Sequence, residues 1–394
     1  MSVYTKEEVI EFIEQEDVKF IRLAFCDIYG NQKNLAILPT ELNRAFEQGI
    51  PFDGSAIDGF TDSAHSDLFL IPIASTLTVL PWRSTSGKVV RMFCEIKKSD
   101  GSVFEKESRH ILQKAVLAAR ELGLDITIGT ECEFYLFKTD EKGEPTKTPF
   151  DNAGYMSVAP EDKGENIRRE ICLTLKEMGI NPESSHHEEG PGQNEIDFRY
   201  ASPLKSADNV MNFITVVKAA AARSGLYADF SPKPLSGQCG NGFHINISVN
   251  SEKGEEVFEP FMAGVLSHIK EMTVFLNPTP ESYDRLGSGK APSSIGWAKE
   301  NRTQLIRIPS YTGNEKRFEV RSPDPMTNPY IAYALLIYAG MDGIKNNAVL
   351  PEPSDSNSKL EPLPKFWGEA ADLARESSFI RGILNNDVES FLHR

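Results

Sequence analysis

The stretch SHHEEGPGQNEIDF, residues 185–198, decides how this chain is interpreted. It holds two histidines, four carboxylates and a Gly-Pro-Gly turn within fourteen residues. Side chains alternate across a β-strand with a period of two. His186 and Glu188 therefore share one face before the turn, and Glu195 and Asp197 share one face after it, with apolar side chains opposite. Either this is a solvated acidic hairpin, or its carboxylates face something positive.

Three further segments show the same division into an apolar and a polar face. They are DITIGTECEFYLF (residues 125–137), GFHINISV (242–249) and KRFEVRS (316–322). The polar positions are Glu131 and Glu133 in the first, His244, Asn246 and Ser248 in the second, and Arg317, Glu319 and Arg321 in the third. Two residues of one face lie roughly 7 Å apart along a strand. Each apolar face predicts a side that packs on the core.

If the four polar faces converge, glutamates and a histidine line one cavity. Like charges at that density cannot stay ionised unless cations compensate them. Oxygen ligands with one imidazole suit Mg²⁺ or Mn²⁺ better than structural zinc. Arginines in these strands and in NRTQLIRIP, residues 301–309, indicate phosphate, which planar guanidinium binds through two hydrogen bonds. The chain has no GxxxxGK[ST] and no GxGxxG motif, so any nucleotide must be held without a P-loop.

Each of these strands also has a plainer interpretation. A single Glu-x-Glu strand is more often a solvent-facing edge, and a lone buried histidine or arginine is usually a structural residue. Four such strands in one chain favour a functional site.

Composition excludes several classes of protein. The 394 residues are 40% hydrophobic, 25% charged and 9% aromatic, with a net charge of −15, so nucleic acid and anionic membranes are not expected partners. The N-terminal segment reads as an acidic amphipathic helix and not as a signal peptide, and the most apolar helix candidate, residues 330–344, is too short to span a bilayer. Five scattered cysteines without CxxC predict reduced thiols in a cytoplasmic protein.

The order of elements predicts an α+β fold with a mainly antiparallel sheet. We expect a hairpin with its turn at residues 29–31, strands in LTVLPWR (77–83) and KVVRMFCEIKK (88–98), and a domain boundary at the turn near residues 97–101. Helical spacing predicts helices around residues 111–122, 164–178, 206–224, 260–276 and 328–346, and one last helical segment after residue 364.

Taken together, the motifs resemble those of type I glutamine synthetases. FDGSAIDGF (52–60), ECEFYLF (131–137), SHHEEGPGQNEIDF, GNGFHINIS (240–248), NRTQLIRIP and RFEVRSPDPMTNPY (317–330) match family segments in family order. The similarity runs from about residue 18 to about residue 344. It implies a β-grasp N-terminal domain over residues 1–98 and a catalytic domain over residues 99–394 whose curved antiparallel strands form a half-barrel.

The resemblance also implies roles for single residues. Glu133, Glu188 and Glu195 match the ligands of the metal beside the substrate, and Glu131, His244 and Glu319 match those of the metal that bridges the ATP phosphates. Arg302, Arg307 and Arg317 match arginines that contact phosphate, and Arg321 matches one near the acceptor carboxylate. Arg285 matches the residue that holds the α-carboxylate of glutamate, in a substrate region that includes Gly240 and Tyr155. Tyr200, Asn246 and Ser248 are the nucleotide candidates, and Asp53 matches the aspartate that helps to bind and deprotonate ammonium.

Several positions depart from the family pattern. The flap segment RLGSGKAPSSIGW, residues 285–297, is one residue shorter and carries Lys290 where a glutamate is usual. A cation there would repel ammonium, or would restrict the enzyme to a substrate with a compensating negative group, unless the shortened flap turns Lys290 to solvent. Cys239 replaces an asparagine near the glutamate amino group, Ala56 replaces a serine, and Asn246 replaces a histidine. No VTxWE-like segment, which in type I enzymes links two hexameric rings, ends the chain.

The resemblance implies an ATP-dependent carboxylate–amine ligase that uses Mg²⁺ or Mn²⁺, with small molecules as its substrates. Glutamine formation from glutamate and ammonia is the family's reaction. A γ-glutamyl ligase for another amine or acid, and a catalytically weak nucleotide- or glutamate-binding ring subunit, remain as alternatives. We expect a homo-oligomeric ring, a hexamer with weaker stacking into a dodecamer, in which Asp53 acts on the neighbouring subunit's site.

Overall fold

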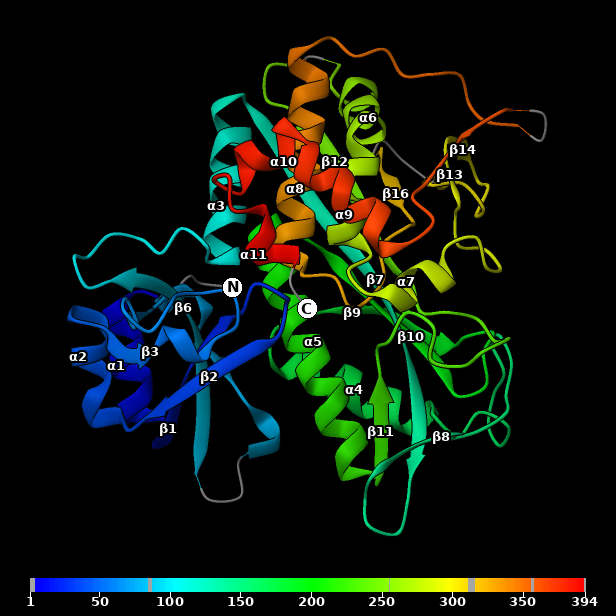
Figure 1. The fold of residues 1–394 in the computed structure, drawn as a ribbon. Helices are drawn as coiled ribbons and strands as arrows, with labels where there is room; N and C mark the ends of the chain where they lie inside the picture. Colours follow the sequence, from blue (N-terminus) through cyan, green and yellow to red (C-terminus); the bar gives the residue numbers. More distant parts are fainter. Residues whose placement is uncertain (1–3, 84–86, 255, 311–315, 356–357, 393–394) are drawn as a thin grey trace.

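The computed structural model describes residues 4–83, 87–254, 256–310, 316–355 and 358–392. The N-terminal part, blue in Figure 1, contains one six-stranded sheet in the order β2-β1-β6-β4-β3, with β5 paired to β6. Its strands are β1 (Val18–Cys26), β2 (Gln32–Ile37), β3 (Ile50–Asp53), β4 (Asp67–Pro72), β5 (Thr78–Val79) and β6 (Lys88–Lys98), and its helices are α1 (Lys6–Gln15) and α2 (Leu42–Glu47). This is the expected β-grasp domain.

The β1–β2 hairpin also attaches the N-terminal part to the rest of the chain. Gly30 in its turn has φ +88°, and a Cβ added there would lie 3.0 Å from the Cα of Asn328. Glycine is therefore required by both the backbone conformation and the close approach. The Asn328 amide donates to the carbonyl oxygens of Asp27 at 3.3 Å and Ile28 at 3.1 Å.

The second part is built on a nine-stranded sheet in the order β14-β15-β16-β12-β7-β10-β9, with β8 and β11 also paired to β7. Its strands are β7 (Leu124–Thr139), β8 (Pro145–Pro149), β9 (Pro182–His187), β10 (Gln193–Ala201), β11 (Leu226–Asp229), β12 (Phe243–Ser251), β14 (Trp297–Lys299), β15 (Ile306–Ile308) and β16 (Phe318–Val320). All pairings are antiparallel except β14 with β15. The expected antiparallel character is confirmed, in the curved sheet of a half-barrel.

Helices cover the apolar face of this sheet (Figure 1). They are α3 (Ser108–Glu121), α4 (Glu165–Glu177), α5 (Pro203–Arg223), α6 (Phe258–Leu276) and α8 (Pro329–Lys345), close to the five expected ranges. Phe134 of β7 and Phe198 of β10 both contact the ring of Phe213 on α5, with ring centroids 6.1 and 5.7 Å away. Since alternate side chains point to opposite faces, Glu131, Glu133, Glu195 and Asp197 must point away from these helices.

Three local expectations were wrong in detail. LTVLPWR forms only the two-residue β5 followed by a 3₁₀ turn, Pro81–Arg83, because proline cannot donate to a sheet. In KRFEVRS only Phe318–Val320 pairs as a strand. The single helical segment expected near the end is three short helices, α9 (Trp367–Glu376), α10 (Ser378–Ile383) and α11 (Val388–Leu392).

The remaining elements are α7 (Pro280–Arg285) and a small sheet of β13 (Ser294–Ile295) with β17 (Glu361–Pro362). Among the described residues, no helix is both long and apolar enough to cross a membrane.

Candidate active site

The register of the large sheet brings the polar faces of its strands together. On β10, Glu195 lies opposite Glu133 and Asp197 lies opposite Glu131 of β7. His244 of β12 lies opposite Glu131 on the other side. Directly opposed residues in an antiparallel pair have their Cβ atoms about 5 Å apart. The carboxylates and the histidine therefore form one continuous polar surface, so these strands meet the condition of convergence that the sequence analysis left open.

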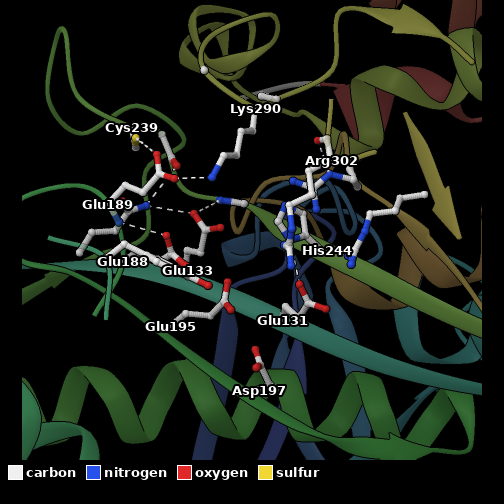
Figure 2. A pocket seen from close by; sticks show the side chains of 18 of the residues that line it. Glu131, Glu133, Glu188, Glu189, Glu195, Asp197, Cys239, His244, Lys290 and Arg302 are labelled. Atoms are coloured by element: carbon white, nitrogen blue, oxygen red, sulfur yellow. Dashed lines mark hydrogen bonds and ion pairs between the residues drawn. The ribbon is translucent and has the colours of Figure 1, made fainter. Parts of the chain in front are cut away.

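This surface is the floor of a cavity of about 490 Å³. Figure 2 shows Glu131, Glu195 and Asp197 on one side, with Arg302 and Lys290 across from them. Of the residues that the sequence analysis assigned to the site, the cavity is lined by Glu131, Glu133, Tyr155, Glu188, Glu195, Gly240, His244, Asn246, Arg285, Arg302, Arg307, Arg317 and Arg321. Acidic and basic groups thus face one space, which suits a site for cations and anions together.

Glu131, His244 and Glu319 come together as expected. Their ligand atoms all lie within 4.8 Å of one another, and His244 Nδ1 is 3.0 Å from Glu131 Oε2 and 3.4 Å from Glu319 Oε1. Burial, aided by the charge of Arg321, holds the pKa of His244 well below its ordinary value. The imidazole is therefore neutral, which is the form that binds metals.

The second expected set, Glu133, Glu188 and Glu195, divides into two overlapping groups. Glu195 lies within 4.8 Å of ligand atoms of Glu133 and His244, and also within that distance of those of His186 and Glu188. His186 Nε2 is 2.9 Å from Glu188 Oε1 and 3.7 Å from Glu195 Oε1. Glu195 is thus the residue shared by both groups.

The carboxyl groups in this region hold their protons more tightly than usual. Burial, and next the charge of Glu188, raises the pKa of Glu133 to about 7. Burial and Glu131 raise the pKa of Asp197 to about 7, and burial and Asp197 raise that of Glu195. Strongly shifted carboxyl groups in a cavity are typical of functional sites, and a bound cation would favour their ionised forms.

The basic side of the cavity contains donors without partners. Arg307 Nη1 donates to Glu319 Oε2 at 2.6 Å, and Arg321 forms an ion pair with Glu319. The Nε atoms of Arg307 and Arg317, and Oδ1 of Asp197, are buried without any hydrogen-bond partner among the described residues. Free donors and a free carboxylate oxygen fit a phosphate group and a divalent cation better than a closed structural network.

A second hollow of about 240 Å³ adjoins the cavity and shares Glu131, Asp197, Asn246 and Arg317 with it. Tyr200 lines this hollow, and the Arg317 guanidinium lies 5.9 Å from the centre of the Tyr200 ring. Asn246 Nδ2 donates to Glu131 Oε1 at 2.9 Å. Ser248, the remaining nucleotide candidate, lines neither hollow and donates to the carbonyl of Lys316 at 3.0 Å.

The residues expected to bind the amino-acid substrate line the cavity but not the second hollow. Arg285 is buried, and its guanidinium donates to the carbonyl oxygens of Ser322 at 2.7 Å and Arg321 at 3.3 Å. Gly240 also lines the cavity. Tyr155 is 52% exposed and meets the ring of His186 edge-on, with centroids 5.4 Å apart.

Lys290, Glu189 and Cys239 form the rim of the cavity (Figure 2). Lys290 forms an ion pair with Glu189, and the Cys239 thiol lies 3.5 Å from the second oxygen of Glu189. The hydrogen bond to Glu189 raises the pKa of Lys290, and burial and Glu189 raise that of Cys239 to about 11. The Lys290 charge is therefore present and is matched by a carboxylate at the rim.

Asp53 does not join this cavity within one chain. It ends β3 in the N-terminal domain, where its carboxylate accepts from the backbone N–H of Ser55 at 2.9 Å and from the Ser55 hydroxyl at 2.6 Å. Asp53 does not line the cavity.

The sequence analysis missed Gln193, which is buried beside the site. Its amide donates to Glu133 Oε2 at 3.0 Å, to the Gly240 carbonyl at 3.2 Å and to Asn241 Oδ1 at 3.2 Å. Gln193 therefore links Glu133 to Gly240, one of the residues expected to bind the amino-acid substrate. A signal was present, because Gln193, Glu195 and Asp197 are alternate residues of one strand.

Comparison with known proteins adds independent information. The family described as "Glutamine synthetase, beta-Grasp domain" matches residues 17–99, and "Glutamine synthetase, catalytic domain" matches residues 105–393. Glutamine synthetase of Clostridium saccharobutylicum is 43% identical, covering 98% of this chain and 93% of that protein. Glutamine synthetase of Staphylococcus aureus strain Mu50 is 41% identical, covering 98% and 92%.

Two solved structures have a closely similar fold. "GmaS/ADP complex-Conformation 1" superposes with a TM-score of 0.88 at 26% identity, covering 98% of this chain and 94% of that chain. "Apo GmaS without ligand" gives 0.88 at 27% identity, covering 97% and 93%. Full-length matches at this identity, on a chain whose carboxylates and arginines meet in one cavity, show that the protein belongs to the glutamine synthetase family.

Proposed function

We propose that this chain is an ATP-dependent ligase of the glutamine synthetase type that joins ammonia to the side-chain carboxylate of glutamate. The observation that carries the proposal is the single cavity whose lining brings Glu131, His244 and the group around Glu195 together with Arg302, Arg307 and Arg317. Glu319 is fully buried and does not line the cavity, but its carboxylate lies within 4.8 Å of the ligand atoms of Glu131 and His244. A cluster of carboxylates without arginines would be typical of a site that binds a structural cation. The arginines that line the same cavity can also bind a phosphate group, as a phosphoryl-transfer site requires.

The chemistry follows from the weakness of a carboxylate as an electrophile. Attack of the substrate carboxylate on the terminal phosphorus of ATP forms an acyl phosphate and releases ADP. Attack of the amine on the acyl carbon then forms the amide and releases phosphate, with one proton lost from the nitrogen. Arg302, Arg307, Arg317 and Arg321 are proposed to stabilise the phosphoryl oxygens during both steps.

Glu131, His244 and Glu319 are proposed to hold one divalent cation, and Glu133, Glu188 and Glu195 another. Oxygen-rich ligands fit Mg²⁺ or Mn²⁺. When bound, such ions neutralise charge on the phosphates and on the substrate carboxylate. His186 joins the second group on geometric grounds, since it contacts both Glu188 and Glu195.

Substrate placement follows from the cavity and the hollow that adjoins it. Arg285, Gly240 and Tyr155 are proposed to bind the amino acid, because Arg285 is a buried cation that lines the cavity but not the adjoining hollow lined by Tyr200. Tyr200 and Asn246 are proposed to bind the nucleoside beside the phosphate-binding arginines. Ser248 is the weakest member of this set because it lines neither hollow.

Assembly completes the proposal. Asp53 lies on the N-terminal domain and does not line its own chain's cavity, so its proposed role in deprotonating ammonium requires a neighbouring subunit. We propose a homo-oligomeric ring, with residues 1–98 as the domain that carries Asp53 and residues 99–394 as the catalytic domain. A cytoplasmic location, with its supply of ATP, fits this proposal.

The test is phosphate release from ATP with glutamate and a panel of amines that includes ammonium, combined with identification of the amide product. Glutamine formation that requires Mg²⁺ or Mn²⁺ is the expected result. Release with ammonium absent but with another amine present would select the second candidate, a γ-glutamyl ligase, which Lys290 and Cys239 at the rim favour. ATP binding without any phosphate release would indicate a catalytically weak homologue.

A further inference from the structure

A buried polar cluster lies behind the turn that carries Glu188, on the side away from the cavity. It consists of Asp151, Asp162, Arg168, His187 and Asn194, all of which are buried. Of these, none lines the cavity. Burying this many charged groups is costly unless each is paired, so their arrangement must serve either stability or position.

His187 contacts the backbone of Glu188, the proposed metal ligand, directly. Its Nδ1 lies 2.7 Å from the backbone carbonyl oxygen of Glu188, and its Nε2 lies 2.9 Å from Asp151 Oδ1. Both partners can only accept, because the Asp151 carboxylate already receives backbone N–H groups on both oxygens, from Gly192 at 3.0 Å and Lys163 at 3.0 Å. Both ring nitrogens must therefore donate, and His187 connects Asp151 to Glu188 as a charged pair.

The same cluster holds the far end of the turn. The N–H of Gly192 donates to Asp151, and its carbonyl accepts from Asn194 Nδ2 at 2.9 Å. Arg168 fixes Asn194 by donating to its Oδ1 at 2.6 Å, and pairs with Asp162 at 2.5 Å. Gly192 has φ +69° and its Cβ would lie 2.8 Å from the Leu136 carbonyl, so no other residue fits this turn.

Asp151, Asp162 and His187 have ligand atoms within 4.8 Å of one another, as a metal site would. Yet both nitrogens of His187 and both oxygens of Asp151 already have protein partners, and both oxygens of Asp162 bond to Arg168. Each of these ligand atoms therefore already has a protein partner, and among the described residues the cluster is better explained as a polar network than as a metal site, although Arg168 Nε has no hydrogen-bond partner there.

We propose that His187 and Asp151 are positioning residues that hold the 188–192 turn so that Glu188 and Glu195 face one cation. Figure 2 shows the Glu188 side chain entering the cavity, and His187 holds the carbonyl of that same residue from behind. Glu195 follows three residues after Gly192, whose amide and carbonyl are both held by the cluster. The inference rests on the proposed role of Glu188 as a metal ligand.

The experiment is a Mn²⁺ titration of the full-length protein, followed by electron paramagnetic resonance of free Mn²⁺, without turnover. The wild type should bind two ions per chain. Asp151→Asn keeps the volume of the side chain but places an amide donor against backbone N–H donors. It should lower the affinity for one of the two Mn²⁺ ions about 10- to 100-fold. His187→Gln should do the same, since one amide cannot reach both acceptors.

A kinetic measurement separates positioning from general damage. In both variants the metal concentration for half-maximal phosphate release should rise, while kcat at saturating metal should stay near that of the wild type. Asp208→Asn is the matched control, because Asp208 is a buried carboxylate paired with Arg109 at 3.0 Å and does not line the cavity. It should lower Tm and leave both Mn²⁺ affinities unchanged.

The outcomes are distinct. Two ions bound with wild-type affinity in Asp151→Asn and His187→Gln would overturn the inference, as would an equal loss in Asp208→Asn. If His187→Gln does not fold, Asp151→Asn decides the question, because it is nearly isosteric. A wild type that binds no Mn²⁺ would instead refute the proposed metal sites themselves.

Discussion

Lys290 gives the sharpest prediction, because it occupies the position at which the family usually has a glutamate. The perturbations are Lys290→Ala, which removes the charge, and Lys290→Glu, which reverses it. An unpaired Lys290 about 4 Å from an ammonium ion would oppose binding by roughly 4 kcal/mol at an effective dielectric of about 20, and by about 1 kcal/mol in water.

The surroundings of Lys290 favour the smaller of these two energies, the one that applies in water. Its side chain is 57% exposed, and it pairs with Glu189, whose side chain is 39% exposed. Exposed ion pairs contribute about 0–1 kcal/mol, so the Lys290 charge is largely compensated and screened. We therefore expect Lys290→Ala to lower the KM for ammonium by about fivefold, corresponding to about 1 kcal/mol. Lys290→Glu, which leaves Glu189 and a second carboxylate at the rim, should lower it further.

The assay is the initial rate of glutamine formation at several ammonium concentrations, with ATP and glutamate saturating. Lys270→Ala is the matched control, because Lys270 forms an exposed ion pair with Glu361 and does not line the cavity. It should leave the KM unchanged. If the wild type already has ordinary ammonium affinity and neither Lys290 variant alters it, Lys290 is a surface residue and the electrostatic argument fails.

Three further predictions follow from other parts of the molecule. Glu195→Gln should lower metal affinity or activity at least about tenfold, because Glu195 belongs to both ligand groups; a Mn²⁺-soaked crystal with no ion at these side chains would contradict it. Burial raises the pKa of Glu107 from 4.5 to about 8. The folded protein therefore loses stability as the pH rises from about 4.5 to about 8, by about 1.4 kcal/mol per pH unit, because Glu107 ionises more readily in the unfolded chain. Below about pH 4.5 Glu107 is protonated in both states and has no such effect, and above about pH 8 the loss is complete. Glu107→Gln should therefore raise Tm increasingly between about pH 5.5 and 8.5, and thermal denaturation that shows a pH-independent difference would refute this. Light scattering should give the mass of a homo-oligomer, most simply a hexamer, and an active monomer would contradict the proposed role of Asp53 across an interface.

Much of the architecture could be predicted from local patterns. The alternation in residues 125–137 and 242–249 placed Glu131, Glu133 and His244 on one face, and the sheet confirms it. The five main helices begin and end within a few residues of the expected positions. These features are local, because a strand or an amphipathic helix shows its buried side through the spacing of its own residues.

The tertiary structure alone decided which of these residues meet. Pairing Glu195 opposite Glu133 depends on the register of β10 against β7, which parity restricts but does not select. It also decided that Asp151 pairs with His187 and that Lys290 pairs with Glu189. These two pairs join residues 36 and 101 positions apart in the chain. Sequence spacing carries no distance information at that range, because the packing of the whole sheet and its helices determines how such segments approach.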